Sequence, residues 1–268
     1  MNSRSNIQSS DSSAPFEGGW MSPYTLHLAD NALILGHRNS EWTGHGPILE
    51  QDIALSNISL DLIGQARNFY QYAAELRNDG STEDTLAYLR DAHEFKNCLL
   101  VEQSNGDWGK TVLRQFLFSA YQYYLYQQLQ KVNDKTIASV AEKALKEVTY
   151  HLRWSSEWVV RLGDGTEESH TRMKSAMNEL WKFTDELLIP APYEIEIANH
   201  GIQLDHTSLK TNWNEKVFSV LKEATIPIPE DQIKSSDGYG KEGYHSEHLD
   251  EILSHMQSLQ RANPGCEW

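Results

Sequence analysis

The sequence predicts an all-α protein, a bundle of long helices with additional helices at its C-terminal end. Apolar residues recur at steps of three and four from Pro47 to Leu76, a run of about 30 residues that would form a helix about 45 Å long. The same period returns in three other long segments, 24–42, 108–131 and 135–162. Almost no stretch alternates apolar and polar residues as a half-buried strand would.

The segment from Pro47 to Leu76 is the helix around which we expect the others to pack. Its apolar face consists of Leu55, Ile58, Leu62, Ala66, Phe69, Ala73 and Leu76. A polar stripe runs beside that face and contains Asn57, Asp61, Gly64, Gln65 and Asn68. A polar stripe flanked by apolar residues predicts a helix that is surrounded by protein and turns some of its polar groups inward.

The turns between the long segments are short. Gly44 and Gly46 end the first helix, and Pro47 suits the first turn of the next one. Asn133 and Asp134 make the corresponding turn later in the chain. Because long helices joined by a few residues pack against each other, we expect the first two long helices to be antiparallel neighbours.

The rest of the chain predicts shorter helices. They cover residues 81–100, 167–188, 208–224 and 246–261. Ser81 and Asp84 resemble a capping pair at the start of the first of these. Pro190, Pro192 and the alternating residues up to Ile197 predict an irregular or short extended connection.

Composition excludes several classes of partner. The chain has 23 basic and 38 acidic residues, a formal net charge of −15. Such a surface repels nucleic-acid phosphates and anionic lipids, so we expect no nucleic-acid or membrane binding. No run of 18 apolar residues is present to span a membrane. A basic partner surface would suit this charge.

The first 20 residues and the cysteines bear on domain organisation and location. Residues 1–20 are rich in Ser and Asn, lack a signal-peptide core and predict a disordered tail, with one helical domain over 21–268. Cys98 and Cys266 lie far apart and have no metal-binding spacing. We therefore expect free thiols and a cytoplasmic location.

Carboxylates at the middle of long helices suggest a ferritin-like di-iron site as a hypothesis. Such a site takes a Glu from each of two helices and a Glu-x-x-His pair from each of the other two. That spacing occurs only at Glu167/His170 and Glu242/His245. The first pair lies in the first turn of a helix and the second beside a glycine-rich loop, so we predict neither as a metal site.

At mid-helix the di-iron pattern is damaged. Gly64, three residues after Asp61, has no side chain, and Val148 stands where an acid should precede His151. The segment 108–131 contains no acidic residue from Thr111 onward. An intact di-iron site is therefore not expected.

Asp61, Glu147 and His151 are interpreted instead as an inward-facing polar network. Buried carboxylates without a metal need counter-charges, because an unpaired buried charge costs several kcal/mol. Lys143, Glu147 and His151 share one helical face, so this face could supply that charge.

Two further clusters combine histidines and acids. The start of the last helix holds His245, Glu247, His248, Glu251 and His255. A surface metal site is one interpretation of it, and a solvated or partner-facing helix is favoured. A cluster near the first turn holds His37, Glu41, His45 and Glu50, for which we favour packing and an interface at the bundle end.

Several stretches of the chain resemble one family closely. They include EWTGHGPILEQDIALSNISLDLIGQARNFYQYAAEL, DTLAYLRD, KEVTYHLRWSSEWVVRLGDGT and GYHSEHLDEILSHMQSLQR. In this order and spacing they resemble the C subunits of bacterial phenylacetyl-CoA epoxidases, multicomponent ring-1,2-epoxidising oxygenases of phenylacetate catabolism. The resemblance covers the chain from about Met21 onward.

The resemblance implies a ferritin-like four-helix bundle with additional C-terminal helices. It also implies a structural, non-catalytic role, in which the chain pairs with the catalytic A subunit that holds the di-iron centre. The other expected partners are the remaining epoxidase subunits, including a reductase that draws electrons from NADPH. By the family pattern, Glu41, Asp61, Glu147 and His151 would be remnants of an ancestral di-iron site, and no cofactor is expected in this chain.

Two alternatives remain open at this point. In the first, the chain is itself a di-iron oxygenase with an irregular ligand set such as Glu41, Asp61, Glu147 and His151. In the second, it is a metal-free helical adaptor with no connection to an oxygenase.

Overall fold

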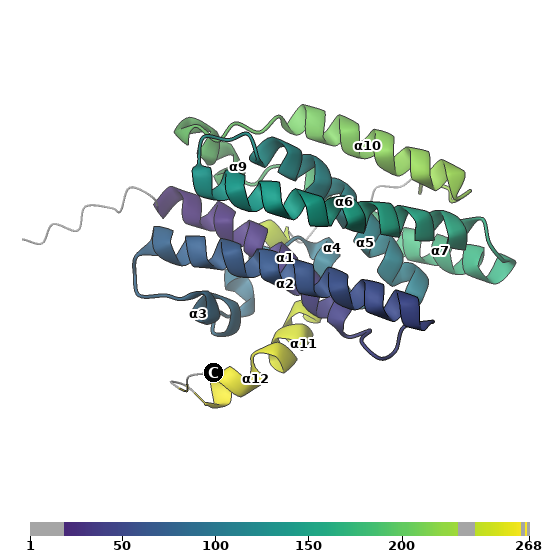
Figure 1. The fold of residues 1–268 in the computed structure, drawn as a ribbon, viewed down its shortest axis with the longest axis horizontal. Helices are drawn as coiled ribbons and strands as arrows, with labels where there is room; N and C mark the ends of the chain where they lie inside the picture. The colour runs from purple at the N-terminus through teal and green to yellow at the C-terminus, as the bar shows by residue number, and fades with distance from the viewer. Residues whose placement is uncertain (1–18, 230–238, 264–265, 267–268) are drawn as a thin grey trace, which may run out of the picture.

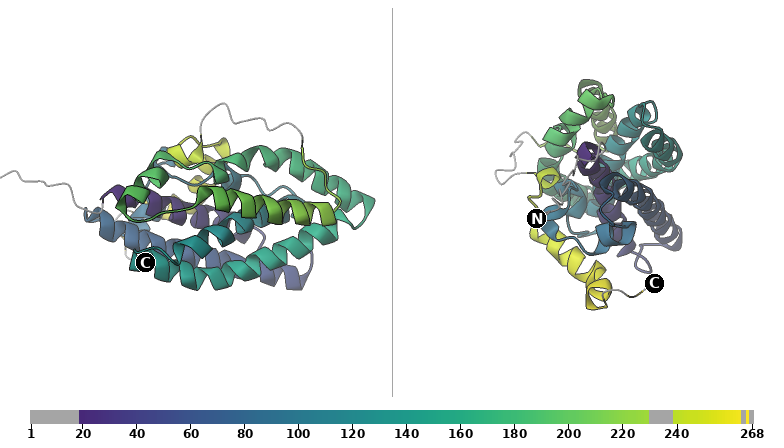
Figure 2. Two further views of the ribbon diagram at one scale, coloured as in Figure 1. Left: turned by 90° about the horizontal axis from the view of Figure 1, so that it is seen from above. Right: turned by 90° about the vertical axis from the view of Figure 1, so that its left-hand side faces the viewer.

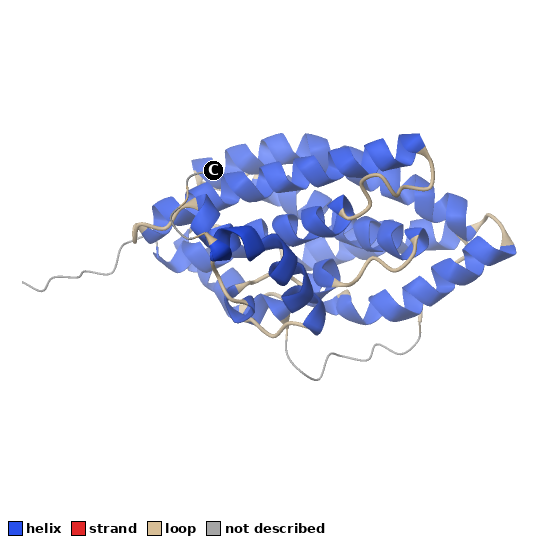
Figure 3. Ribbon diagram, turned by 90° about the horizontal axis from the view of Figure 1, so that it is seen from below, coloured by secondary structure: helices blue, strands red, loops and turns tan. Residues whose placement is uncertain are grey.

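The computed structural model describes residues 19–229, 239–263 and 266, and this part of the chain contains helices, turns and loops but no strand (Figure 3). The all-α prediction is confirmed. The α-helices are, in chain order, α1 (Ser22–Ser40), α2 (Leu49–Arg77), α3 (Glu83–Tyr88), α4 (Leu99–Glu102), α5 (Trp108–Leu129), α6 (Lys135–Gly163), α7 (Glu167–Leu180), α8 (Asp185–Leu188), α9 (Pro192–Glu196), α10 (His206–Glu223), α11 (Glu247–Met256) and α12 (Ser258–Ala262).

Four long helices form the bundle as two antiparallel pairs, α1 with α2 and α5 with α6 (Figure 1). The right-hand view of Figure 2 looks along the bundle. In α2, the predicted apolar face is buried from Leu55 to Ala73, and Leu76 is partly buried. Asn78, in the left-handed region at φ 48°, ends α2.

The polar stripe of α2 lies at the edge of the core. Gln65 is buried, Asp61 and Asn68 are half-buried, and Asn57 and Gly64 are exposed. The stripe thus turns only part of its length inward, because α2 has protein on two sides and not all around.

A tryptophan cluster closes one end of the bundle. The Trp108 ring lies edge-on to the rings of Trp42, Trp154 and Trp158, with centroids 5.2, 6.0 and 6.1 Å apart. The indole N–H of Trp154 donates to Gln51 Oε1 at 2.9 Å, and that of Trp42 donates to Thr111 Oγ1 at 2.9 Å. Such edge-to-face pairs fix the orientation of the helices that contribute them.

The additional helices cover selected sides of the bundle. α10 packs along α5 and α6, where the Trp213 indole donates to the Leu117 carbonyl at 3.0 Å. α7 packs against α5 and α6 as well. α11 and α4 pack on α1, and α3 lies at the C-terminal half of α2.

The single helix predicted over 81–100 is wrong. The chain forms α3, a 3-10 turn (Ala92–Glu94), an extended stretch and the short α4. Thr82 and Thr85, and not Ser81 and Asp84, make the capping box. A continuous helix with Leu86, Leu89, Phe95 and Leu99 on one buried side would cover Leu89, which is 47 % exposed. The extended stretch replaces helix here because its backbone N–H groups bind side chains from distant helices.

Other boundaries also differ from the prediction. The segment 167–188 breaks into α7, a 3-10 turn (Trp181–Phe183) and α8, and the last helix breaks into α11 and α12 at Gln257. The connection expected to be irregular contains α9, which begins at Pro192. The predicted tail lies outside the described residues up to residue 18, and Gly19–Met21 form a 3-10 turn before α1.

Candidate functional site

An Asp–His pair joins α2 and α6 near the middle of both helices. His151 Nε2 lies 2.9 Å from Asp61 Oδ2. The His151 side chain is fully buried, whereas that of Asp61 is 35 % exposed. His151 Nδ1 is buried and has no hydrogen-bond partner among the residues that the structure describes. The periodic face of α6 places His151 toward α2, so the pair follows from helix spacing in both segments.

One turn further along, Glu147 takes part in a second contact between the same helices. Gln65 Nε2 donates to Glu147 Oε2 at 2.9 Å, and Gln122 Nε2 of α5 donates to Gln65 Oε1 at 2.9 Å. A chain of hydrogen bonds therefore joins α6, α2 and α5. It explains how a buried amide such as Gln65 is tolerated in the core.

Lys143 was expected to supply a counter-charge to these carboxylates, and it forms no ion pair with them. Its side chain instead lines a groove of about 200 Å³ between α2 and α6. The groove is lined by Leu60, Asp61, Gly64, Gln65, Asn68, Val140, Lys143, Ala144 and Glu147. The polar network thus opens to this groove and is not sealed inside the core.

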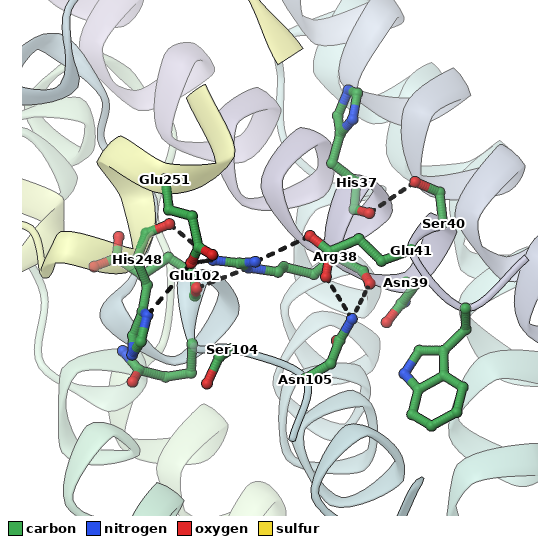
Figure 4. A network of polar contacts seen from close by, with 12 residues as sticks. His37, Arg38, Asn39, Ser40, Glu41, Glu102, Ser104, Asn105, His248 and Glu251 are labelled. Carbon is green, nitrogen blue, oxygen red and sulfur yellow. Dashed lines mark hydrogen bonds and ion pairs between the residues drawn. The ribbon is translucent and has the colours of Figure 1, made fainter. Parts of the chain in front are cut away.

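Glu41 lies in a different network at the end of α1 (Figure 4). Arg38 Nη1 donates to Glu41 Oε1 at 2.9 Å, and Asn105 Nδ2 donates to Glu41 Oε2 at 2.7 Å. Arg38 also binds the carbonyls of Glu102 and His248 at 3.0 and 2.8 Å. The structure brings Asp61 to His151, but it does not bring Glu41 to them.

These residues do not fit a di-iron centre. Asp61 and His151 are bonded to each other, and the positions that should complete their Glu-x-x-His pairs are Gly64 and Val148. α5 contributes buried amides, Gln115 and Gln122, where a carboxylate ligand is required. In the part of the chain that the structure describes, no three His, Cys, Asp or Glu side chains converge as metal ligands.

The two Glu-x-x-His matches have local roles. His170 Nδ1 lies 2.7 Å from the Gly163 carbonyl at the start of α7. His245 is nearly buried, with Nδ1 2.8 Å from Glu102 Oε2 and Nε2 3.0 Å from the Phe95 carbonyl. Burial opposes protonation of His245, yet Glu102 outweighs it and raises the pKa of His245 above 6.5.

Two acids of the His/acid clusters, Glu41 and Glu251, meet at Arg38, whose Nη2 lies 3.5 Å from Glu251 Oε2 (Figure 4). His248 Nδ1 lies 3.8 Å from Glu251 Oε2 on the surface of α11. His37 is largely buried, and desolvation lowers its pKa to about 4. His45 Nδ1 lies 3.2 Å from the Thr43 carbonyl in the turn after α1.

A buried ionic centre on α1 was not anticipated. Asp30, fully buried, pairs with Arg90 and accepts hydrogen bonds from the Tyr70 hydroxyl at 2.5 Å and the Lys96 backbone N–H at 2.8 Å. The signal available in the sequence was an acidic residue in the middle of the apolar run 24–35. A buried carboxylate there required a cation from elsewhere in the chain.

The segment after residue 238 is held by three more buried carboxylates, one of which is Glu186, whose Oε1 accepts the Lys241 backbone N–H at 2.8 Å. Lys241 Nζ lies 2.7 Å from Glu194 Oε2, with both side chains 2 % exposed. Glu102, fully buried, accepts the Ser246 backbone N–H at 2.7 Å and pairs with His245. We call residues 239–262 the C-terminal strap, because these contacts fasten it to α1, α4 and α9.

The remaining expectations concern thiols and membranes. Cys98 is buried and Cys266 is exposed, and both are free thiols as predicted. Desolvation raises the pKa of Cys98 well above its ordinary value. None of the helices in the described ranges has the length and apolar character needed to cross a membrane.

Comparison with known proteins assigns the family. The sequence model of the family described as Phenylacetic acid catabolic protein (PaaA_PaaC) matches residues 9–268. The chain is also 46 % identical over 248 residues to the C subunit of 1,2-phenylacetyl-CoA epoxidase from Escherichia coli (strain K12). That alignment covers 92 % of this chain and 99 % of the relative. The chain therefore belongs to the PaaA_PaaC family of phenylacetic acid catabolic proteins.

Proposed function

We propose that this chain is a structural, non-catalytic subunit of a phenylacetyl-CoA 1,2-epoxidase and that it pairs with the catalytic di-iron subunit. Its similarity over nearly its whole length to the C subunit of such an epoxidase supports the assignment to the complex. The chain binds and stabilises the catalytic partner, and the oxygen chemistry takes place in that partner.

The donor set at the bundle centre is the observation that carries the non-catalytic role. Asp61 is bonded to His151, and Glu147 is bonded to Gln65. Glu41 is bonded to Arg38 and Asn105 at the end of α1. Side chains committed to one another in this way brace the helices, and they do not form the open coordination shell that an oxygenase iron requires.

Iron analysis of two preparations tests this proposal. The chain is purified alone and after co-expression with the catalytic subunit of the same host, and iron is measured per chain by elemental analysis. We expect near-zero iron in the chain alone and about two irons per heterodimer, the number that a di-iron partner carries. Two irons in the isolated chain would instead make it a di-iron protein, with Asp61, Glu147 and His151 the first residues to substitute.

An activity measurement addresses the structural role directly. The catalytic subunit is expressed with and without this chain, and epoxidation of phenylacetyl-CoA is assayed with the reductase and NADPH. We expect the catalytic subunit alone to be insoluble or inactive. Full activity of the catalytic subunit alone would refute a stabilising role. Failure of the two chains to co-purify would favour an adaptor for some other partner.

A further inference from the structure

The outward side of α2 carries a stripe of exposed apolar side chains. Leu49, Ile53 and Leu60 are 71, 51 and 67 % exposed, and their spacing of four and seven places them along one side of the helix. Gly64 continues the stripe one turn further. From Leu49 to Gly64 the stripe is about 22 Å long. Ile48, the residue before α2, is 51 % exposed at the same end, and the other exposed large apolar residues in the described ranges are scattered over different segments.

The α-helices outside the bundle leave this side of α2 uncovered within the described ranges. α7 and α10 pack on α5 and α6, and α11 packs on α1. α3 does pack on α2, but at its C-terminal half. In Figure 1, α2 and α6 run side by side across the front of the molecule with no helix over them. We call this surface the α2 face, defined by Leu49, Ile53, Leu60 and Gly64.

The groove between α2 and α6 adjoins the α2 face. Leu60 and Gly64 line it, and a side chain added at Gly64 would meet no atom within 4 Å of its Cβ. Asp61 and Glu147 each use one carboxylate oxygen for an internal bond, to His151 and Gln65. The second oxygen of each accepts no hydrogen bond from the described residues, so both remain available to a donor in the groove.

Charge decides which kind of side chain suits the groove. Its lining contains two carboxylates and one cation, Lys143. The whole chain carries a net charge of −15, so a partner with a basic contact surface gains electrostatic energy on approach. A guanidinium or ammonium group between Asp61 and Glu147 would make charge-assisted hydrogen bonds with both.

We propose that the α2 face is the docking surface for the catalytic subunit, which lays a helix along Leu49, Ile53 and Leu60 and inserts an Arg or Lys into the groove at Gly64. This inference rests on the proposed function, because it names the surface through which the two subunits pair. An apolar helical stripe with one buried charged contact is a common way for helical subunits to combine affinity with a fixed register.

A competition experiment tests this docking surface. Tagged wild-type chain and an untagged variant are co-expressed with the catalytic subunit, and the ratio of the two chains in the purified complex reports their relative affinity. Leu60→Asp should lower the affinity by about 30-fold or more, as the loss of an interface hot spot does. Leu259→Asp is the matched control, since Leu259 is 51 % exposed on α12, and it should compete as wild type does.

Two further variants distinguish a loss of binding from a loss of folding. Gly64→Leu replaces a helical glycine with a better helix former, and its Cβ meets no atom within 4 Å. It should therefore fold at least as stably as wild type, occupy the groove and still lose affinity about 10-fold or more. Glu147→Gln keeps an oxygen for Gln65 and removes a charge, so it should weaken binding several-fold and reduce its dependence on salt.

The outcomes separate this inference from the proposed function. If wild-type chain forms no complex with the catalytic subunit, the proposed function fails and the docking surface fails with it. If the complex forms and Leu60→Asp and Gly64→Leu compete as well as wild type, the α2 face is not the docking surface, although the pairing stands. An equal loss of affinity with Leu259→Asp would also overturn the docking surface. So would sedimentation experiments in which the variants weaken only a dimer of this chain.

Discussion

α1 and α2 are antiparallel neighbours in one bundle, and their surroundings differ. All residues of α1 except Pro23, His37 and Ser40 are buried, because α2, α4, α9 and α11 surround it. α2 exposes a stripe of two leucines and an isoleucine at helical spacing in its N-terminal half. The chain completes its own packing around α1, whereas it leaves apolar side chains of α2 exposed within the described residues.

The polar groups of the two helices differ in the same way. Asp30 on α1 is buried and hydrogen-bonded to Arg90, Tyr70 and the Lys96 backbone N–H. Asp61 on α2 bonds His151 but keeps about a third of its side chain in solvent. A buried ion pair is costly to break, whereas a solvent-exposed one contributes little.

The largest effect expected from this contrast comes from removing one charge on each helix. Asp30→Asn leaves Arg90 buried and uncompensated, so it should lower the free energy of unfolding by about 3–5 kcal/mol. Asp61→Asn is the matched substitution on α2 and should cost about 1 kcal/mol or less. Urea unfolding followed by circular dichroism measures both. Equal losses of unfolding free energy would show that the two carboxylates are equally shielded from solvent.

Acid should unfold the chain through the α1 side. Burial lowers the pKa of His27 on α1 to about 4, so the folded state binds a proton there only at lower pH than the unfolded state, whose pKa is 6.5. The contribution of neutral His27 is therefore fully present above pH 6.5 and is lost as the pH falls toward 4. The shift corresponds to about 3 kcal/mol.

The measurement is the unfolding free energy of wild type and His27→Gln as a function of pH. The variant should show a shallower loss between pH 6.5 and 4. Parallel curves for the two proteins would assign the acid sensitivity to other groups, such as His37, whose pKa burial also lowers to about 4.

The C-terminal strap offers a smaller, local test of how α1 is covered. Glu102→Gln removes the charge that pairs with His245 and weakens the bonds to Ser246, which should cost about 2 kcal/mol. Because Glu102 raises the pKa of His245, this contribution is present below pH 6.5 and is lost as the pH rises through the higher folded pKa.

Hydrogen–deuterium exchange is the measurement for that variant. Exchange should increase in the strap around α11 and remain unchanged in α2. Faster exchange in α2 to the same extent would mean that the strap supports the whole bundle and not only the α1 side.

Substitution of the glycines should have the smallest effect on stability, and the sign of this effect should differ between the two helices. Gly64→Ala on α2 adds a methyl group in open space and should stabilise the chain by about 0.5–1 kcal/mol. Gly36→Ala on α1 places Cβ 3.1 Å from Ile63 Cγ1 and 3.3 Å from the Ser59 carbonyl, so it should be destabilising. Thermal unfolding of both variants checks the signs. Stabilisation by Gly36→Ala would show that the α1–α2 contact can relax.

Sequence periodicity could predict the long helices but not the connections between them. α2 and α6 follow from apolar residues at steps of three and four, and the Asp61–His151 contact agrees with the polar network expected there. The stretch around Cys98 could not be predicted, because its helix is replaced by bonds to side chains far away in sequence. The Cys98 N–H binds Asn31 Oδ1 and the Leu99 N–H binds Glu186 Oε2, across 67 and 87 residues.

The charge pairs could not be predicted from the sequence either. Glu41 and Asp61 are both acidic, but they lie in different networks. Glu41 binds Arg38 and Asn105 because the end of α1 packs against the loop before α5. Arg90 pairs with Asp30 across 60 residues. Local spacing cannot reveal such partners, because they are set by the tertiary packing of segments that share no helix.

The C-terminal strap has a consequence for the order of events during synthesis. Glu102 and Glu194 are synthesised well before their partners His245, Ser246 and Lys241. Until the strap has been synthesised, both carboxylates lack those partners. The two carboxylates are removed from solvent when the strap docks. Completion of the core around α1 therefore waits until the strap has been synthesised, although the four bundle helices precede it in the chain.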